Sequence, residues 1–231
     1  SKRYPMMEAS PHLLFHEKTD QIMRLVLLAL FPSIVASIIF FGARSLLLYV
    51  ISITTCLLSE FVWFRIRNHS LPKDYSAAVT GVLLAMSLPV SVPLWYPALG
   101  GVIGIIVAKE LFGGIGRNLL NPALTGRAVL RLIFVKEMSE NVQPQPFFSI
   151  NGLDVVSSAT PLMEAKAGES LSSGQMVDSL TGLIAGKNAE TTAILLLLGG
   201  LFLLYKKVIT WHIPLCMIGT IIILALFIGK G

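Results

Sequence analysis

The chain has 231 residues, of which 54% are hydrophobic and 13% are charged, whereas about 25% of the residues of an ordinary soluble domain are charged. The net charge of +5 does not come from basic runs with interleaved aromatic residues, which argues against a nucleic-acid-binding protein. The composition therefore predicts an integral membrane protein. Cys56 and Cys216 both lie in apolar segments without a Cys-x-x-Cys pair, so we expect two buried thiols and assign no metal ligand.

Seven apolar segments follow one another along the chain. They cover residues 22–41, 46–64, 77–92, 98–108, 123–135, 191–205 and 214–228. The first two and the last are long enough to span a bilayer of about 30 Å alone, whereas the fourth and fifth are short and are separated by a glycine-rich stretch and Pro122. Broken helices at membrane depth are tolerated where protein or a cavity satisfies their backbone. We predict an all-α, polytopic membrane protein with about seven transmembrane or broken helices, forming a single domain over residues 1–231.

The distribution of lysine and arginine predicts which side of the membrane each connector faces. With a cytoplasmic N-terminus, the inner side receives Lys2, Arg3, Lys18, Arg65, Arg67, Lys73, Lys109, Arg117, Lys206 and Lys207. The short outer connectors then receive Arg44 alone, and the long connector over residues 136–190 holds three lysines against seven acids. Because cytoplasmic loops are enriched in Lys and Arg, we predict a cytoplasmic N-terminus and an extracytoplasmic loop over residues 136–190.

Three stretches of the chain carry distinctive motifs. Residues 154–161 read Asp-Val-Val-Ser-Ser-Ala-Thr-Pro, and the small neighbours leave the Thr160 hydroxyl accessible to an enzyme, although such stretches are also common in ordinary turns. Residues 74–89 place small residues on one face, and residues 109–127 read KELFGGIGRNLLNPALTGR. Together with Ser-Pro-His at 10–12, these motifs resemble the family that contains the D subunit of the Rnf complex and the B subunit of the sodium-pumping NADH:quinone reductase, Nqr. The resemblance covers essentially the whole chain.

This resemblance implies a covalently bound flavin in the outer loop. In the family a flavin transferase esterifies FMN phosphate onto a threonine, which corresponds here to Thr160. The accompanying attachment motif comprises Asp154, Ser157, Ser158 and Ala159, with Ser158 standing where the family usually has glycine. Asp154 would act during attachment, by binding the metal of the transferase or by aiding deprotonation. The family continues through further membrane segments, which implies that this chain is truncated.

The resemblance also implies a second, non-covalent flavin, riboflavin, near residues 109–127. Side-chain amides can hydrogen-bond the pyrimidine edge of a flavin, and Asn118 and Asn121 lie where the chain breaks. Gly113, Gly114 and Gly116 would allow close approach of the backbone. The alternative is that both amides cap the broken helices.

Four charged residues lie in or beside the apolar segments, where a lipid-facing charge costs about 2.5–3.5 kcal/mol or more. Arg24 and Glu60 lie near the cytoplasmic ends of their segments, which favours snorkelling to the membrane surface. Arg127 and Arg131 are four residues apart, so on a helix they share a face. We expect both to point into the protein, where they make a structural pairing, hold a flavin anion or contact a neighbouring subunit.

Three functions fit these observations. The favoured one is a component of an Rnf-type complex in the cytoplasmic (inner) membrane, which relays electrons between ferredoxin and NAD⁺ through covalent FMN and is coupled to Na⁺ or H⁺ export. The alternatives are the B subunit of Nqr and a cofactor-free secondary transporter. The chain has no NAD-binding fingerprint and no iron–sulfur cysteine set, so it holds no complete active site. We therefore expect other membrane and peripheral subunits as partners, including a second flavin subunit and iron–sulfur subunits, and a flavin transferase for maturation.

Overall fold

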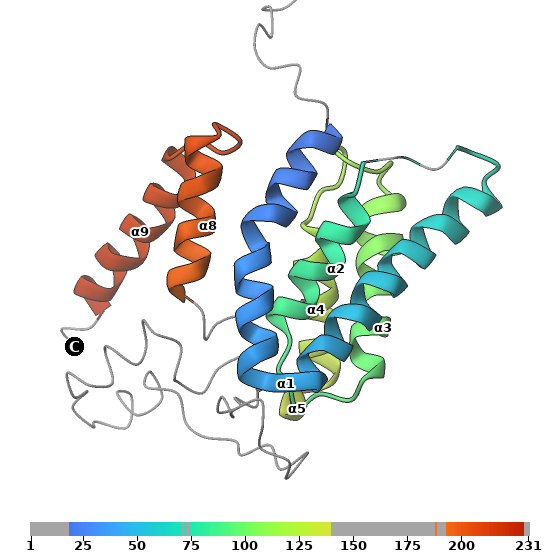
Figure 1. Ribbon diagram of the computed structural model, residues 1–231, viewed down its shortest axis with the longest axis horizontal. Helices are drawn as coiled ribbons and strands as arrows, with labels where there is room; N and C mark the ends of the chain where they lie inside the picture. The colour runs from blue at the N-terminus through green and yellow to red at the C-terminus, as the bar shows by residue number, and fades with distance from the viewer. Residues whose placement is uncertain (1–18, 71, 73, 140–187, 189–192, 229–231) are drawn as a thin grey trace, which may run out of the picture.

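The computed structural model describes residues 19–70, 72, 74–139, 188 and 193–228, and this part of the chain contains helices and no strand (Figure 1). Its elements are α1 (Thr19–Ile66), α2 (Ser76–Ser87), α3 (Trp95–Val102), the π-helix η1 (Ile103–Glu110), α4 (Pro122–Ile133), α5 (Val135–Ser139), α8 (Ala193–Tyr205) and α9 (His212–Ile228). The prediction of an all-α fold is confirmed, and the apolar composition of these helices agrees with a membrane protein.

Helix α1 is a hairpin of two helical arms. Gly42 separates the arms with a φ of 66° and a ψ of −153°, a conformation that a residue without a Cβ atom adopts readily. The arms correspond to the predicted segments 22–41 and 46–64, but they meet at this single bend. Within the described residues, α1 is the helix whose length and apolar composition suffice to cross a membrane.

The next two predicted segments have different boundaries in the structure. The sequence predicted that this segment continues to residue 92, but helix α2 ends at Ser87. The helix ends early because Pro89 and Pro93 have no backbone N–H group to donate helical hydrogen bonds. The segment expected over residues 98–108 is longer, since α3 and η1 follow each other without a break from Trp95 to Glu110.

The helices approach one another through small residues. A Cβ atom added to Gly81 of α2 would lie 2.7 Å from Ile53 Cα of α1, and one added to Gly199 of α8 would lie 2.5 Å from the Ala29 carbonyl oxygen of α1. Such contacts leave no room for a side chain, so the backbones pack directly, as is common between membrane helices. The buried face of α1 accordingly carries hydroxyl side chains, namely Ser33, Ser37, Ser45, Ser52 and Ser59. Large apolar side chains lie outside; examples are Leu28, Phe31, Leu58 and Leu198.

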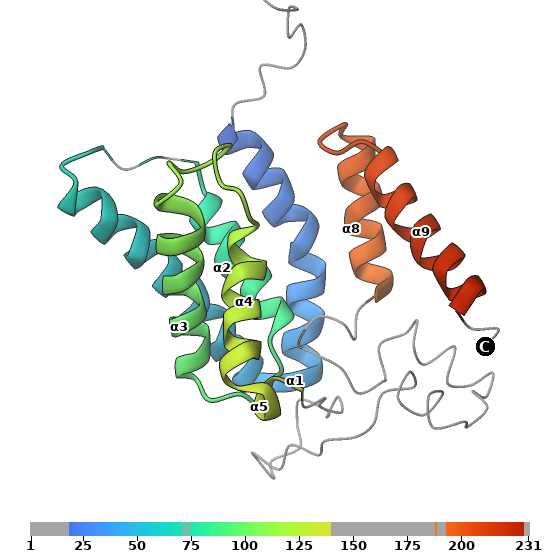
Figure 2. The ribbon, with the colours of Figure 1, turned by 180° about the vertical axis from the view of Figure 1, so that it is seen from behind.

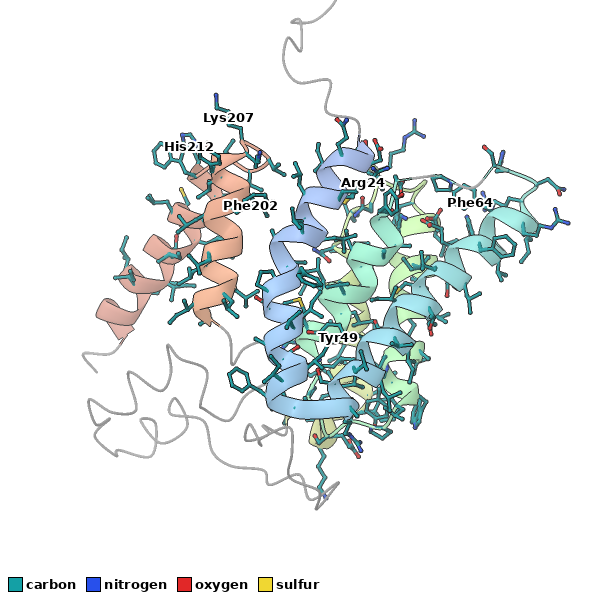
Figure 3. All side chains as sticks on the ribbon, in the orientation of Figure 1. Arg24, Tyr49, Phe64, Phe202, Lys207 and His212 are labelled. Carbon is teal, nitrogen blue, oxygen red and sulfur yellow. The ribbon has the colours of Figure 1, made fainter. Side chains whose placement is uncertain are left out.

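The helices alternate in direction, which gives the bundle two distinct ends (Figures 1 and 2). One end, called here the Arg24 end, holds the start of α1, the end of its second arm, the start of α2 and the turn between α8 and α9 (Figure 3). The opposite end holds the bend of α1, the start of α3 and α5. This alternation agrees with the one that the Lys and Arg distribution predicts.

The two cysteines differ in their surroundings. Cys56 is buried, as expected, but Cys216 of α9 is exposed, so the expectation of a second buried thiol was wrong. The reason is that the described part of the molecule covers little of α9, whose large apolar side chains are exposed on all sides.

Candidate functional site

A cluster of buried charged side chains lies at the Arg24 end, between α1, α2 and η1. The Lys109 ammonium group donates hydrogen bonds to Glu60 Oε1 and, at 2.6 Å, to Ser76 Oγ. It also lies 3.4 Å from Glu110 Oε1. The exposed fractions are 2% for Lys109, 4% for Glu60 and 5% for Glu110, so this cluster is shielded from lipid and from water.

The expectation that Glu60 snorkels to the membrane surface was wrong. Glu60 turns inward because Lys109, which lies 49 residues away in the chain, offers a buried partner of opposite charge. Arg24 behaves as expected: its side chain is 60% exposed, lies 3.4 Å from Asp20 and stacks over the ring of Tyr75 at 4.9 Å. The Glu60–Lys109 pair could not be predicted from local sequence patterns, because the two residues are far apart in the chain.

The buried cluster carries more negative than positive charge when its groups are ionised. Glu60 and Glu110 supply two carboxylates for one ammonium group, and Glu110 Oε1 accepts no hydrogen bond within the described part. Ser76 Oγ donates onward to Asp74 Oδ1 at 2.8 Å, which extends the polar chain toward the start of α2. Buried charge is costly unless it is compensated, so a cation would stabilise this arrangement.

The loop after η1 begins with a glycine turn at the helix end. The Gly114 amide donates to the Lys109 carbonyl at 3.1 Å, and the Gly113 amide donates to the Glu110 carbonyl at 3.1 Å. This pattern is a Schellman motif, which satisfies the last carbonyls of a helix and favours a residue with positive φ. Gly113, Gly114 and Gly116 have φ values of 104°, 86° and 81°. The positive φ values are therefore sufficient to explain why glycine occupies these three positions, without a ligand.

Two of these glycines also border open space. A Cβ atom added to Gly114 or Gly116 would meet no atom within 4 Å. The helix that precedes the loop ends in π-type hydrogen bonding, with the Leu111 amide donating to the Ile106 carbonyl at 3.0 Å. π-Helical turns are rare and concentrate at functional sites. The loop thus follows a π-helix, η1, and has an accessible backbone at Gly114 and Gly116.

The two candidate asparagines lie at the end of this loop. Asn121 is the N-cap of α4, and its Oδ1 accepts hydrogen bonds from the amides of Ala123 and Leu124 at 3.0 and 3.2 Å. Asn118 Nδ2 donates to the Leu120 carbonyl at 3.1 Å. The side-chain oxygen of Asn121 therefore caps α4, as the alternative to flavin binding predicted. Asn121 Nδ2 and Asn118 Oδ1 make no hydrogen bond with the described residues, and the riboflavin role stays a prediction.

The two arginines of α4 do not both point inward, contrary to expectation. The helix buries Ala123, Gly126 and Leu130, so Arg127 and Arg131 each lie one residue round the helix from the buried face. Arg127 is half-buried and has an interaction partner, whereas Arg131 is exposed.

Arg131 lies in the last turn of α4, three residues before Phe134, which belongs to an aromatic cluster. It precedes Phe134, whose ring centroid is 5.3 Å from that of Trp95 and 4.5 Å from that of Tyr96. Aromatic residues gather where membrane helices meet water. This position favours an arginine that reaches the membrane surface over one that binds a buried anion.

At the opposite end, Arg44 holds the non-helical connection that follows α2. Its Nε donates to the Val90 carbonyl at 2.7 Å. Its Nη2 donates to the carbonyls of Ser91 and Val92 at 2.9 and 3.0 Å. A single side chain thus satisfies three carbonyl groups that no helix satisfies.

Asn188 binds the last turn of α2 and the first residue after it. Its side chain is fully buried; Nδ2 donates to the Ala85 carbonyl at 3.2 Å, and the backbone amide donates to the Leu88 carbonyl at 3.2 Å. Its Oδ1 accepts a hydrogen bond from Ser45 Oγ at 2.6 Å. Sequence reasoning gave Asn188 no role. The signal that could have found it is the proline pair at 89 and 93, which predicts free carbonyls in need of donors.

The attachment motif lies outside the described residues. Thr160 and the accompanying Asp154, Ser157, Ser158 and Ala159 fall within 140–187, so the structure does not test their assignment. The chain enters this stretch from α5 and leaves it at Asn188.

The fold and the buried polar groups define a helical membrane protein with broken helices and a charged interior at one end. The family model described as "NQR2, RnfD, RnfE family" matches residues 6–231. The chain therefore belongs to that family, and the resemblance in its motifs is confirmed.

Curated relatives agree with this assignment. The D subunit of the Na(+)-translocating ferredoxin:NAD(+) oxidoreductase complex of Acetobacterium woodii is 37% identical over 227 residues, which cover 97% of this chain and 70% of that protein. The D subunit of the ion-translocating oxidoreductase complex of Escherichia coli is 34% identical, with 94% of this chain and 71% of that protein covered. Its counterpart of the same name in Shigella boydii shows the same identity and coverage.

Proposed function

We propose that the chain is a membrane component of an Rnf-type ion-translocating oxidoreductase complex and relays electrons between ferredoxin and NAD⁺. The observation that carries this proposal is the similarity along nearly the whole chain to a protein whose complex is named for that reaction. Other membrane and peripheral subunits, among them a second flavin subunit and iron–sulfur subunits, would supply the NAD site and the clusters.

Thr160 is the proposed anchor of a covalent FMN, and the flavin, when bound, supplies the one-electron chemistry. The threonine side chain then acts as a tether and takes no part as acid, base or nucleophile in turnover. A tether raises the effective concentration of the flavin at its site to the order of millimolar or more. The Asp154 carboxylate would act during attachment by the flavin transferase.

The test is co-expression with the matching transferase, followed by intact-protein mass and in-gel flavin fluorescence. We expect one esterified FMN in the wild type and none in Thr160→Val, which keeps the branched shape and lacks the oxygen. Ser157→Ala and Ser158→Ala are matched controls that should retain label. Fluorescence that persists in Thr160→Val, with a modified peptide elsewhere, would refute the anchor and leave a cofactor-free transporter in contention.

The loop between η1 and α4 is the proposed riboflavin site. Its described residues fit a flavin: Gly114 and Gly116 border open space, while Asn118 Oδ1 and Asn121 Nδ2 are one acceptor and one donor not used elsewhere in the described part. The loop side chains Leu119 and Leu120 are 79% and 55% exposed, which gives the ring system apolar neighbours.

Capping and flavin binding can be separated at Asn121. Asn121→Ser keeps an N-cap oxygen for α4 and removes the amide donor, so we expect normal stability with less acid-extractable riboflavin and unchanged covalent FMN. Asn118→Leu should lower extractable riboflavin in the same way. Wild-type riboflavin content in both variants would show that the two amides serve the fold alone.

The buried cluster around Lys109 is the proposed site of coupling to Na⁺ or H⁺ export. Its two carboxylates and single ammonium group favour one additional cation. Glu110→Gln removes the negative charge with little change of shape, and it should alter the dependence of electron transfer on Na⁺ concentration or on pH, whichever ion is coupled. If neither dependence changes in an assembled complex, the cluster is a structural feature only.

The membrane orientation is proposed from the basic side chains at the Arg24 end, which would be cytoplasmic. In intact cells, a cysteine introduced by Ser172→Cys should react with an impermeant thiol reagent, and one introduced by Asn68→Cys should not. The reverse labelling pattern would overturn the orientation.

The B subunit of Nqr remains the second candidate, because the matching family model includes that branch. The two functions differ in their electron donor and acceptor. Purified complex that transfers electrons from NADH to quinone, and not between ferredoxin and NAD⁺, would select the Nqr assignment.

A further inference from the structure

We infer that Asp74 is the entry group of the buried cluster around Lys109: a cation from the aqueous phase at the Arg24 end passes Asp74 before it reaches the cluster. This inference rests on the proposed role of the cluster in ion coupling. It starts from Glu110 Oε1, which is buried beside Lys109 and accepts no hydrogen bond within the described part of the chain. A cation that neutralises this carboxylate needs a polar route, because an unpaired charge in an apolar interior is costly.

A continuous hydrogen-bonded chain leads from Lys109 to Asp74. Lys109 Nζ donates to Ser76 Oγ at 2.6 Å, and Ser76 Oγ donates to Asp74 Oδ1 at 2.8 Å. A hydroxyl group accepts through its lone pairs and donates its single hydrogen, so one serine joins the buried ammonium group to the Asp74 carboxylate. Glu60 lies within electrostatic range of Asp74 as well. The polar chain therefore extends from the cluster to the start of α2.

The exposure of these residues decreases from the surface inward. Asp74 is partly exposed, whereas Ser76 and Lys109 have exposed fractions of 6% and 2%. Asp74 is thus the member of this hydrogen-bonded chain that reaches water at the Arg24 end.

An apolar floor closes the other side of the cluster. It consists of three fully buried side chains of one hydrophobic cluster, namely Cys56, Ala77 and Ile105. Cys56 lies four residues before Glu60, and Ile105 lies four residues before Lys109. Both are therefore about one helical turn farther from the Arg24 end than the charged residues. A cation from the opposite end would have to cross this floor, whereas Asp74 offers a carboxylate at the Arg24 end.

The orientation of Asp74 is accompanied by an unusual backbone conformation at the next residue. Tyr75 has a φ of 58° and a ψ of 7°, a left-handed conformation that costs energy in a residue with a bulky side chain. With this backbone, Asp74 Oδ1 accepts from the Ser76 amide at 3.1 Å as well as from its hydroxyl group. The guanidinium carbon of Arg24 lies 4.9 Å from the centre of the Tyr75 ring. Asp74 therefore points toward Ser76 and the cluster.

Thiol labelling of the purified complex tests the route independently of electron transfer. Ser76→Cys is treated with a positively and a negatively charged methanethiosulfonate reagent of similar size, and modification is measured on the peptide that contains residue 76. The ratio of the two rates cancels the intrinsic reactivity of the thiol. Asp74→Asn keeps an acceptor oxygen and removes the charge, so it should lower the ratio of positive to negative reagent about tenfold. Asp20→Asn, which removes a carboxylate at the same end but outside this chain, is the matched control and should leave the ratio unchanged.

Electron transfer by the assembled complex tests the role in ion uptake. With serine at position 76, Asp74→Asn should raise the concentration of the coupled ion, Na⁺ or H⁺, at half-maximal rate about tenfold. The maximal rate should change much less, because ion entry limits turnover only at low ion concentration. Asp20→Asn should shift neither quantity.

The two measurements separate failure of the route from failure of the coupling proposal. An unchanged labelling ratio in Asp74→Asn, or no reaction of either reagent at residue 76, would overturn the entry group. The entry group also fails if Glu110→Gln alters the ion dependence and Asp74→Asn does not. If the labelling ratio falls but neither Glu110→Gln nor Asp74→Asn alters the ion dependence, the cation route stands and the proposed coupling function is wrong.

Discussion

The two ends of the bundle bury polar groups in different ways. At the Arg24 end the buried groups are charged side chains, with Lys109 joining α1, α2 and η1 through Glu60, Ser76 and its neighbour Glu110. At the opposite end they are backbone carbonyls, which Arg44 and Asn188 satisfy. The first arrangement holds two carboxyl groups against one ammonium group. In the second arrangement, side-chain donors satisfy the hydrogen-bonding capacity of the carbonyls.

The largest expected effect comes from breaking the charged end. Lys109→Met leaves two carboxylates buried without their counter-ion, and we expect a loss of about 3–5 kcal/mol in stability. Thermal unfolding of the purified protein in detergent would measure it. Adding Glu60→Gln to the same chain should recover part of the loss, since one uncompensated charge then disappears; no recovery would mean that the two side chains do not act as a pair.

A comparable substitution at the opposite end should cost less. Arg44→Met leaves three carbonyls without donors, and we expect a loss of about 3 kcal/mol. Arg44→Lys can satisfy part of this set and should fall between Met and wild type. The same unfolding assay measures both, and identical stability of Met and wild type would show that water replaces the guanidinium group.

Helix packing should show a smaller effect that is independent of either end. Gly81→Ala places a Cβ atom 2.7 Å from Ile53 Cα, so α1 and α2 must separate, at a cost of about 1–3 kcal/mol. Gly200→Ala is the matched control, because a Cβ atom there meets nothing within 4 Å. Helix propensity favours alanine over glycine at both positions, so a similar loss in both variants would contradict the packing explanation.

The smallest expected effect concerns the cap of α4. Asn121→Ala removes the oxygen that accepts from the amides of Ala123 and Leu124, which should cost about 1 kcal/mol. Asn121→Asp keeps an acceptor and should restore most of that stability. If Asn121→Ala unfolds at the wild-type temperature, the cap contributes little to stability.

Much of the fold followed from patterns within single segments. The apolar runs predicted the helices, and the glycine-rich stretch with Pro122 predicted the break between η1 and α4. The boundaries were less certain: the end of α2 at Ser87 depends on Pro89 and Pro93, whose effect the apolar run concealed. The candidate site was predictable in the same local sense, since Gly113 and Asn121 act on neighbours within a few residues.

The sequence by itself determined the class of protein, the family and the alternation of the helices, because hydropathy, motif spacing and the placement of Lys and Arg are properties of the chain read in order. Only the tertiary structure decided which polar groups are paired. Glu60 with Lys109, Arg44 with Val90 and Asn188 with Ala85 are all distant in sequence. No local sequence pattern predicts these pairs, because the packing of the helices determines which side chains meet.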